Sequence, residues 1–495
     1  MPIKGRLLAN LDIIREYIGN SSDVVIRLLR PKDNEVMAAV VYIDGLADGQ
    51  MIQNNIIRPV LQNFPPKKEN LNASELLEKV KDSVLTIRDL KEVDTLNECL
   101  KEALSGNTVL LLDNCRRALI LVTPGWKVRI PEEPISEPTV RGPRDGFSEN
   151  LQDNLVTLRR RIKDPNLTII KMELGRRSKT DTAIIFIKDI ADPKIVDEVR
   201  DRLSRIDADS IIAAGHVEQY IEDDFLSLFP QIQYTERPDK VAANLMEGRV
   251  AILVDNTPFA SIVPVTFSMF LQATEDNYDR WIYTSLIRSI RYIAVLLSLF
   301  LPAFYVALIS YHFGMIPTKL AIFIAAAREG IPFPALIEAF LMEFTLEILR
   351  EASLRLPKSI GQAVGIVGGL VIGEAATRAG IVSPEMVIIV SLTAISSFSV
   401  PQYALGVSMR ILRFAIMLAA GVLGLYGVML SFIMITSHLV KLKSFGVDYM
   451  SPIAPMQPKD WKDYIIKAPA NMLKNRPASI NTLNTKRENQ RKGRG

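Results

Sequence analysis

The sequence predicts an α+β membrane protein, in which two tandem cytosolic α/β subdomains are followed by an all-α polytopic membrane domain. The first observation is an uneven distribution of charge: residues 1–280 carry charged side chains throughout, whereas 292–311 and 386–438 contain long stretches with almost none. The second observation is an internal repeat within the charged half. The third is length, because 495 residues exceed what one hydrophobic core usually organises.

We expect seven segments, which follow one another along the chain: an N-terminal helical lead (1–30), a first α/β subdomain (31–122), a Pro-rich linker (123–147), a second α/β subdomain (148–257), a junction with an interfacial helix (258–291), the membrane domain (292–440) and a basic cytosolic tail (441–495). Met1 is not followed by a basic and then apolar leader, so we expect no cleaved export signal and a cytosolic first half. The two cysteines, Cys99 and Cys115, agree with a reducing compartment. The net charge of +4 is too small to indicate nucleic-acid binding.

Two pairs of similar segments form the internal repeat. "AVVYIDGLAD" at 39–48 aligns without a gap with "AIIFIKDIAD" at 183–192, and "GNTVLLLDN" at 106–114 aligns with "GRVAILVDN" at 248–256. In each copy a β-rich run ends in Ala-Asp, a helical segment follows, and a Gly, a strand and an Asp-Asn turn come last. Because both pairs occur in the same order at nearly equal offsets, we interpret them as a tandem duplication of a small α/β unit.

The linker and the start of the second copy have distinct patterns. Five prolines between residues 123 and 147 predict an extended and fairly stiff connector. The second copy then opens with a helix whose apolar residues share one face: Leu151, Leu155, Leu158 and Ile162. Beside this face we interpret Arg159-Arg160-Arg161 as a solvated helix end, with contact to anionic lipid headgroups or an acidic partner as the alternative.

The second half contains three uncharged segments long enough to cross about 30 Å of hydrocarbon: Tyr292–Tyr311, Met386–Val407 and Phe414–His438. A shorter uncharged segment, 361–373, has glycine at every fourth position: Gly361, Gly365, Gly369 and Gly373. This spacing predicts a helix-packing face, because glycines on one face let two helix backbones approach closely. A flexible Gly-rich loop is the alternative, which the intervening Val and Ile residues disfavour.

Charged residues interrupt the apolar half between Pro334 and Pro357. By helical spacing four of them share one stripe, whereas Glu338 lies elsewhere; the four are Glu343, Glu347, Arg350 and Glu351. Such a helix does not face lipid, because exposed charges there cost several kcal/mol each. Two interpretations stay open: structural ion pairs, Glu347–Arg350 and Glu351–Arg355, or a wet passage in which Glu338, Glu343 and Glu347 contribute to an ion path.

The topology is only partly fixed by charge. Residues 439–495 hold 12 Lys and Arg against 4 Asp and Glu, so the positive-inside rule places this tail in the cytosol. Both ends inside require an even number of spans, four or six. Arg410 and Arg413, between the last two uncharged segments, fit poorly with four, and the number stays open.

Motifs for several kinds of chemistry are missing from the sequence. It contains no G-x-x-x-x-G-K-[ST] loop, no H-E-x-x-H pair and no G-x-S-x-G elbow. The three histidines, His216, His312 and His438, are scattered, and we expect packing or interface roles for them. We therefore predict that the protein is not an enzyme and has no catalytic residues, no cofactor and no metal site.

Three long blocks carry a family resemblance: "VRGPRDGFSENLQDNLVTLRRRIKDPNL" (140–167), "DNTPFASIVPVTF" (255–267) with "EDNYDRW" (275–281), and "AAAREGIPFPALIEAFLMEFTLEILREASLRLPKSIGQAVGIVGGLVIGEAATRAGIVSP" (325–384). Together they resemble the A subunit of the spore germinant receptors of endospore-forming bacteria, the GerA family. The resemblance covers about residues 25 to 476. Asn277 departs from it, because the family usually has an aromatic residue beside Tyr278, which affects only local packing.

The resemblance implies a non-enzymatic, multi-pass protein of the spore inner membrane, with its N-terminal domains and its tail in the cytosol. It implies a subunit of a nutrient germinant receptor, which oligomerises to form or gate an ion path that triggers germination. The implied partners are a transporter-like B subunit, a lipoprotein C subunit, membrane lipid and further copies of the A subunit, but no nucleic acid. A paralogue that supports dipicolinate release is an open alternative.

Between the two halves lies an apolar stretch that the resemblance does not explain by itself. Its apolar residues have the composition of a segment pressed against the membrane interface: Phe259, Ile262, Val263, Val265, Phe267 and Phe270. The candidate coupling residues of this junction are Pro258, Phe259, Pro264 and Phe267. The helix from Trp281 onward then reads as anchored among headgroups by its aromatic and arginine side chains. We hypothesise that this junction transmits movement between the cytosolic domains and the membrane bundle; a passive anchor is the alternative.

Three classes of function remain open at this stage. A channel subunit would close by dewetting of apolar side chains on the Gly-rich helix, and Val364, Val367 and Val371 are the candidates. A secondary transporter would use Glu338 or Glu343 to carry a proton or cation. A scaffold would only organise its partners.

Overall fold

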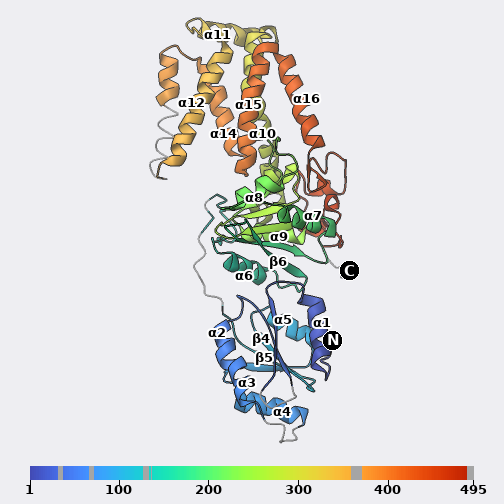
Figure 1. Ribbon diagram of the computed structural model, residues 1–495. Helices are drawn as coiled ribbons and strands as arrows, with labels where there is room; N and C mark the ends of the chain where they lie inside the picture. Colours follow the sequence, from blue (N-terminus) through green and yellow to red (C-terminus); the bar gives the residue numbers. More distant parts are fainter. Residues whose placement is uncertain (32–36, 66–71, 126–132, 135, 358–370, 488–495) are drawn as a thin grey trace.

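The computed structural model describes residues 1–31, 37–65, 72–125, 133–134, 136–357 and 371–487. Figure 1 shows three parts stacked along one axis: an N-terminal α/β unit, a second α/β unit and a group of long helices. The second unit is in the middle, and both the helices and the C-terminal tail contribute side chains to its hydrophobic clusters.

The first unit is a five-stranded antiparallel sheet between two layers of helices, with strand order β1-β2-β4-β5-β3. Its strands are β1 (Val24–Leu29), β2 (Ala38–Ile43), β3 (Leu90–Val93), β4 (Thr108–Leu112) and β5 (Ala118–Leu121). Helices α1 (Leu7–Ile18) and α5 (Leu96–Ala103) cover one face, and α2 (Gly49–Ile52), α3 (Arg58–Asn63) and α4 (Ala73–Lys79) cover the other, with π turns at Gln53–Ile57 and Val80–Val84. Successive β2 residues, Ala39 and Val40, enter different clusters, so both faces of the sheet are apolar.

The second unit repeats this plan, with strand order β6-β7-β9-β10-β8. Its strands are β6 (Leu167–Leu174), β7 (Thr180–Ile187), β8 (Gln233–Thr235), β9 (Val250–Val254) and β10 (Ala260–Val263). Helices α6 (Leu151–Arg161) and α9 (Pro238–Met246) pack on one face, and α7 (Pro193–Ser204) and α8 (Ala214–Ile221) pack on the other. The cluster under α6 and α9 continues without a break into the long helices.

A capping hydrogen bond is repeated in both units. The Asp113 carboxylate accepts the N–H of Leu7 at the start of α1 at 2.9 Å, and Asp255 accepts the N–H of Leu151 at the start of α6 at 2.9 Å. A carboxylate at this position satisfies a free helix N–H and interacts favourably with the helix dipole. The aligned Asp-Asn turn thus has the same structural role in both copies, which supports the tandem duplication.

Two of the predicted boundaries are wrong. The proposed N-terminal lead contains α1, whose buried residues Leu7, Leu11 and Ile14 belong to the core of the first unit. The second unit does not end at 257, because β10 pairs with both β9 and β8 inside the sheet. The Asp-Asn turn is the loop of a hairpin between two neighbouring strands, so it does not close the unit.

Arg159 joins the two units and is not solvated at a helix end. Its side chain is 2% exposed and donates to the Asp23 carboxylate at 2.7 and 2.9 Å and to Ser21 Oγ at 2.8 Å. Arg161 pairs with Asp145 in the same unit. Both of our interpretations of this arginine run are therefore wrong for Arg159 and Arg161, because their partners are acidic residues of the chain itself.

The helical part consists of α10 (Trp281–Ser310), α11 (Thr318–Arg328), α12 (Ala335–Arg355), α14 (Pro384–Phe398), α15 (Tyr403–Leu423) and α16 (Leu425–Lys441), and residues 371–378 are also helical. Short 3-10 turns lie at Phe267–Leu271, Thr274–Asn277 and Phe313–Met315. Within the described residues two helices are long and apolar enough to cross a membrane, Trp281–Ser310 and Tyr403–Leu423. The shorter apolar helices are α14 and α16.

Two predicted spans have different limits in the structure. The segment Met386–Val407 is divided between α14 and α15 by a turn that contains Pro401. Proline has no backbone N–H, so it does not continue the hydrogen-bond pattern of α14. The segment Phe414–His438 is divided at Gly424, whose φ of 62° ends α15 in a conformation that favours glycine. Arg410 and Arg413 therefore lie within α15 and not between two spans.

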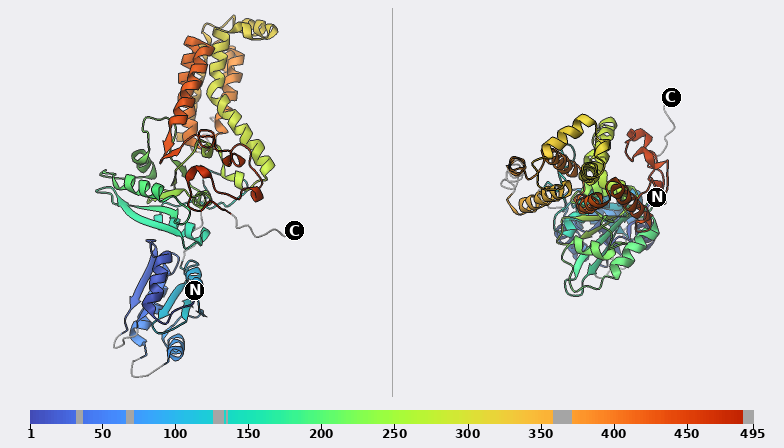
Figure 2. Two further views of the ribbon diagram at one scale, coloured as in Figure 1. Left: turned by 90° about the vertical axis from the view of Figure 1, so that its right-hand side faces the viewer. Right: turned by 90° about the horizontal axis from the view of Figure 1, so that it is seen from above.

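The C-terminal tail packs against the second unit (Figure 2) and is not a free basic extension. It forms a small hairpin, β11 (Lys443–Ser444) and β12 (Val447–Asp448), followed by 3-10 turns at Asp460–Lys462, Ala470–Met472 and Ala478–Ile480. Ile480 is buried in the cluster under α7 and α8, and the N–H of Leu483 donates to the carbonyl of Ile190 at 3.0 Å. The tail is thereby part of the second unit's core.

Candidate functional site

The junction between the second unit and the helices is built around one buried carboxylate, Asp276, in the 3-10 turn Thr274–Asn277. Arg288 of α10 donates Nε to Asp276 Oδ2 at 2.9 Å. Arg291, one turn further along α10, donates Nη1 to both carboxylate oxygens at 2.9 and 2.8 Å. Arg288 also donates to the Asp463 carboxylate of the tail at 2.8 Å. Because these arginines bind carboxylates of the chain, our expectation that they anchor among lipid headgroups is wrong.

A second buried ion pair connects the junction to the linker. Arg237, which precedes α9, donates to the Asp239 carboxylate at 3.1 and 3.0 Å and to the carbonyl of Pro143 at 2.7 Å. The Tyr278 hydroxyl donates to the same Asp239 carboxylate. Burial raises the pKa of Tyr278, and this hydrogen bond raises it further, so the hydroxyl stays protonated and remains a donor. One network thus joins the linker, α9 and the turn before α10.

Gly142 is required where the linker passes the junction. Its φ is 144°, and a Cβ placed there would lie 2.9 Å from the Tyr278 ring. Two residues away, the N–H of Val140 donates to Glu275 Oε1 at 2.7 Å. The glycine therefore allows the linker backbone to lie against Tyr278, which a larger residue would prevent.

Glu137 extends the network from the linker to the helices. Its carboxylate accepts from Lys240 of α9 at 2.7 Å and from the Gln402 side chain at 2.9 Å. Gln402 immediately precedes α15, and the Gln402 side chain is buried. The linker, the second unit and the start of α15 are therefore held together through one carboxylate.

The four predicted junction residues lie in or next to the second sheet. Pro258 and Phe259 are in the hairpin loop before β10, and the Phe259 ring meets Tyr234 of β8 edge-on at 5.6 Å. Pro264 directly follows β10, and its carbonyl accepts a hydrogen bond from buried Arg249. Phe267 packs near Tyr449 of the tail, with 6.3 Å between ring centres. Pro264 is buried and the other three are half-buried, so these residues contact the protein itself between the sheet and the helices, and their position at the membrane interface stays a prediction.

The predicted carboxylates of α12 are held by arginines from other helices. Glu338 is fully buried, lies 2.6 Å from Arg328 of α11 and accepts from the N–H and hydroxyl of Ser383 at 3.0 Å each. Glu343 is also buried and pairs with Arg413 of α15 at 2.6 Å. One oxygen of Glu343, Oε1, has no hydrogen-bond partner. The two acidic groups thus hold α12 against α11, α14 and α15.

Further along α12 the charges become more exposed. Glu347 lies 3.6 Å from Arg350 and 3.5 Å from Arg410 of α15. Glu351 and Arg355 form an exposed pair at 2.5 Å. Both ion pairs that we considered on α12 are therefore present, and Arg410 and Arg413 have acidic partners on α12, Glu347 and Glu343.

Most of the predicted gate and glycine positions lie outside the described residues: Val364, Val367, Gly361, Gly365 and Gly369. Val371 is described, and it is exposed at the start of a helical segment. Gly373 is buried, and a Cβ there would lie 3.4 Å from Val387 of α14. Gly373 therefore faces a neighbouring helix, as a packing residue does, whereas Val371 faces away from it.

Sequence reasoning missed the acidic centre of the junction, Asp276, and the Arg237–Asp239 pair. The signal for Asp276 was its place in a short acidic run 12 to 15 residues before two arginines at helical spacing, Arg288 and Arg291. In the described part of the chain, no group of three or more His, Cys, Asp and Glu side chains is placed to hold a metal ion. The arrangement stabilises a contact between domains and provides no nucleophile with an adjacent base.

Comparison with known proteins identifies the family. The family model described as "Bacillus/Clostridium GerA spore germination protein" matches residues 12–479. The chain belongs to the GerA family. It is a spore germination protein, similar to the A subunits of germinant receptors, and the resemblance seen in its sequence blocks is confirmed.

Individual relatives are similar over nearly the whole length. "Spore germination protein KA" of Bacillus subtilis (strain 168) is 44% identical over 479 residues, covering 97% of this chain and 87% of the relative. The "Uncharacterized membrane protein YfkQ" of the same organism is 42% identical, covering 98% of this chain and 93% of the relative. A solved structure also matches: the crystal structure of the N-terminal domain of the A subunit of the Bacillus megaterium spore germinant receptor GerK3. The match has 38% sequence identity and a TM-score of 0.42, and it covers 54% of this chain and 98% of that domain.

Proposed function

We propose that this GerA-family chain is the A subunit of a nutrient germinant receptor in the spore inner membrane. Copies of it assemble through their helical domains around an ion path whose opening triggers germination. A transporter-like B subunit and a lipoprotein C subunit complete the receptor, and both α/β units and the tail lie in the cytosol. Family membership and the two helices long enough to span a membrane support this proposal.

The observation that carries the assembly is the change in packing along α12. Its first turns are buried against other helices, through Ala335, Glu338 and Ala339. Beyond them, Phe344 and Ile348 are 62% and 56% exposed, and the exposed Glu351–Arg355 pair follows on the same helix. Lipid is a poor neighbour for these charges, and water is a poor neighbour for the large apolar side chains. A helix face with exposed apolar side chains followed by exposed charges is therefore consistent with a contact between copies of the chain, next to a water-filled passage.

Different residues have different roles in this proposal. The buried pairs Glu338–Arg328 and Glu343–Arg413 fix the position of α12. Glu347, the third of the candidate carboxylates, lies closest to the exposed C-terminal half of α12 and contributes to the ion path. The glycines at 361, 365, 369 and 373 pack the following helix. Val364, Val367 and Val371 narrow the passage and close it by dewetting.

The junction couples the cytosolic units to this passage. Movement of the second unit is transmitted through the Asp276 ion pairs to α10 and through Glu137 and Gln402 to α15. The segment with Pro258, Phe259, Pro264 and Phe267 sets the position of the sheet beneath these contacts. A secondary transporter is less well supported, because Glu338 and Glu343 are each held by an arginine of another helix.

A paired substitution tests the assembly. Phe344→Gln/Ile348→Gln replaces two exposed residues one turn apart on α12, and Met429→Gln/Ile433→Gln makes the same change on the exposed face of α16 as a control. We expect the α12 variant to lose its oligomeric mass in detergent and to prevent nutrient germination in the host spore, with the control unchanged in both. An α12 variant with the wild-type mass and normal germination would refute this assembly face.

A further inference from the structure

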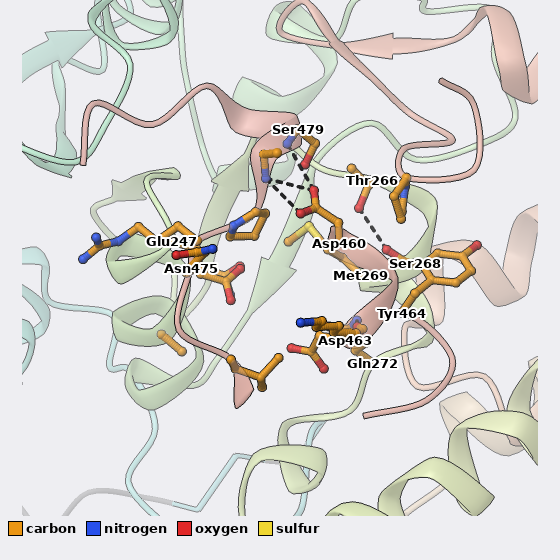
Figure 3. A pocket seen from close by; sticks show the side chains of 18 of the residues that line it. Glu247, Thr266, Ser268, Met269, Gln272, Asp460, Asp463, Tyr464, Asn475 and Ser479 are labelled. Carbon is orange, nitrogen blue, oxygen red and sulfur yellow. Dashed lines mark hydrogen bonds between the residues drawn. The ribbon is translucent and has the colours of Figure 1, made fainter. Parts of the chain in front are cut away.

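A cavity of about 670 Å³ lies between the second unit and the tail and borders the junction, because Thr274, Asn277 and Arg288 are among its lining residues. Figure 3 shows its walls: Thr266, Ser268, Met269 and Gln272 come from the segment after β10, and Asp460, Asp463, Tyr464, Asn475 and Ser479 come from the tail. The volume is within the range of pockets that hold small molecules, about 300–1,000 Å³. The tail supplies one wall of this space, and the second unit supplies the other.

Three polar groups that line the cavity are buried and have no hydrogen-bond partner among the described residues. Gln233 Oε1, Arg249 Nε and Ser451 Oγ belong to side chains that are each 3% exposed or less. A buried polar atom without a partner costs about 1–3 kcal/mol, so such atoms are rare in the absence of a ligand or water. Arg249 is anchored by the carbonyl of Pro264, and its Nε lies 3.8 Å from Glu247 Oε2, which is too far for a hydrogen bond. The three groups provide two donors and two acceptors for a bound molecule.

The charge of the lining selects for an anion. Nine Lys and Arg residues line the cavity against three Asp and Glu residues. The three carboxylates are already engaged: Glu247 by Arg487, Asp463 by Arg288, and Asp460 by the N–H groups of Ala478 and Ser479. Four lysines on the lining form no ion pair with any described residue: Lys459, Lys462, Lys474 and Lys486.

Arg476 is one of the cations that line the cavity, and it lies close to another, Arg487. The Arg476 guanidinium donates to the backbone carbonyls of Met246, Asn484 and Lys486 at 2.6, 2.9 and 2.5 Å, and it forms no ion pair with a described carboxylate. Burial lowers the pKa of Arg476, and the neighbouring charge of Arg487 lowers it further. A bound anion would relieve this repulsion.

We propose that this cavity binds a small polyanion, a molecule with at least two carboxylate or phosphate groups, on the cytosolic side of the protein. Arg249 and Ser451 donate to the inner end of the ligand, Gln233 Oε1 accepts from a protonated oxygen of the ligand, and the unpaired lysines neutralise its outer groups. Because the tail forms one wall, the bound anion fixes the tail against the second unit. The ligand is either a free cytosolic anion or a lipid headgroup, which share this chemistry. The inference does not depend on the ion path proposed above.

The test uses the full-length chain in detergent at low ionic strength. Isothermal titration calorimetry measures the binding of pyrophosphate and of citrate, and thermal unfolding is measured in nanodiscs with and without anionic phospholipid. The variant Lys462→Glu/Lys474→Glu reverses two exposed, unpaired charges at the cavity. The control Lys91→Glu/Lys101→Glu makes the same change in net charge at exposed positions of the first unit. Gln233→Glu places a carboxylate among the inner groups.

We expect one pyrophosphate or citrate ion per wild-type chain, with affinity at least about tenfold lower after the cavity reversal and unchanged in the control. Gln233→Glu should also weaken binding. If neither ion binds but anionic lipid stabilises the wild type and control more than the cavity variants, the ligand is a headgroup. The proposal fails if no probe binds and lipid charge has no effect, or if control and cavity variants lose binding equally, since the attraction would then be unspecific.

Discussion

Asp276→Asn is the substitution that tests the junction most severely. It removes the negative charge between Arg288 and Arg291, which lie 2.8–2.9 Å from it and are both buried. Arg288 keeps Asp463 as a partner, but Arg291 keeps only the carbonyl of Leu271 at 3.3 Å. Breaking a buried ion pair by removing one partner costs about 3–5 kcal/mol, because the remaining charge stays desolvated. We expect a loss of this size in the free energy of unfolding.

The assay is thermal or denaturant unfolding of the full-length chain in detergent, followed by tryptophan fluorescence. Trp281 at the start of α10 lies close to the affected turn and reports on it. Asp209→Asn is the matched control, because it removes a carboxylate from an exposed ion pair with Arg176 at 2.9 Å. Exposed pairs contribute about 0–1 kcal/mol, so the control should unfold almost like the wild type.

A double-mutant cycle separates the ion pair from other effects of the substitution. Arg291→Gln leaves Asp276 paired with Arg288, so it should cost less than Asp276→Asn. The double variant should be more stable than the sum of the single losses implies, by about 1–3 kcal/mol. If Asp276→Asn costs no more than Asp209→Asn, or if the two junction losses are additive, the buried ion pair does not hold α10 to the second unit.

Three further predictions concern other parts of the chain. Arg159→Met leaves the buried Asp23 carboxylate with only the Ser21 hydroxyl as a partner, and it should lower the free energy of unfolding by about 3–5 kcal/mol. Adding Asp23→Asn should restore part of this loss, and denaturant unfolding measures both variants. Burial, and to a smaller extent the charge of Glu218, raises the pKa of Glu222 from 4.5 to about 7. The folded protein therefore holds a proton that the unfolded chain releases, and the stability that this proton provides is lost as pH rises through 7. Glu222→Gln should remove this part of the pH dependence of the melting temperature, measured between pH 5 and 8. Glu343→Gln leaves Arg413 buried without a carboxylate and should lower the melting temperature in detergent, whereas Glu343→Gln/Arg413→Met should recover part of the loss.

The α/β repeat could be predicted because its signal is local. Each strand-like run and the Ala-Asp helix start or Asp-Asn turn that ends it fall within one segment of about ten residues, and the duplication doubles the observation. Strand β10 was missed because it is only four residues long and lies between two prolines, Pro258 and Pro264. Such a segment has the composition of an apolar loop, and only its pairing with β8 and β9 makes it a strand.

The ends of the long helices and the partners of their charges are set by distant contacts. Hydropathy does not reveal that Gly424 has a positive φ or that the chain turns at Pro401. Nor does it reveal that Arg413 meets Glu343 on another helix, although the presence of both charges in apolar segments indicated that they needed partners. Arginines near a predicted span are typical of headgroup anchors. Arg288 and Arg291 were therefore misinterpreted, because the sequence alone does not show that Asp276 lies beside them.

Single-channel recording of the purified full-length chain in a planar bilayer tests the central proposal most directly. The account predicts unitary cation currents from the oligomer alone, which disappear when Phe344→Gln/Ile348→Gln prevents assembly and persist in Met429→Gln/Ile433→Gln. A correctly assembled oligomer that never conducts, with or without the B and C subunits and nutrient, would contradict it.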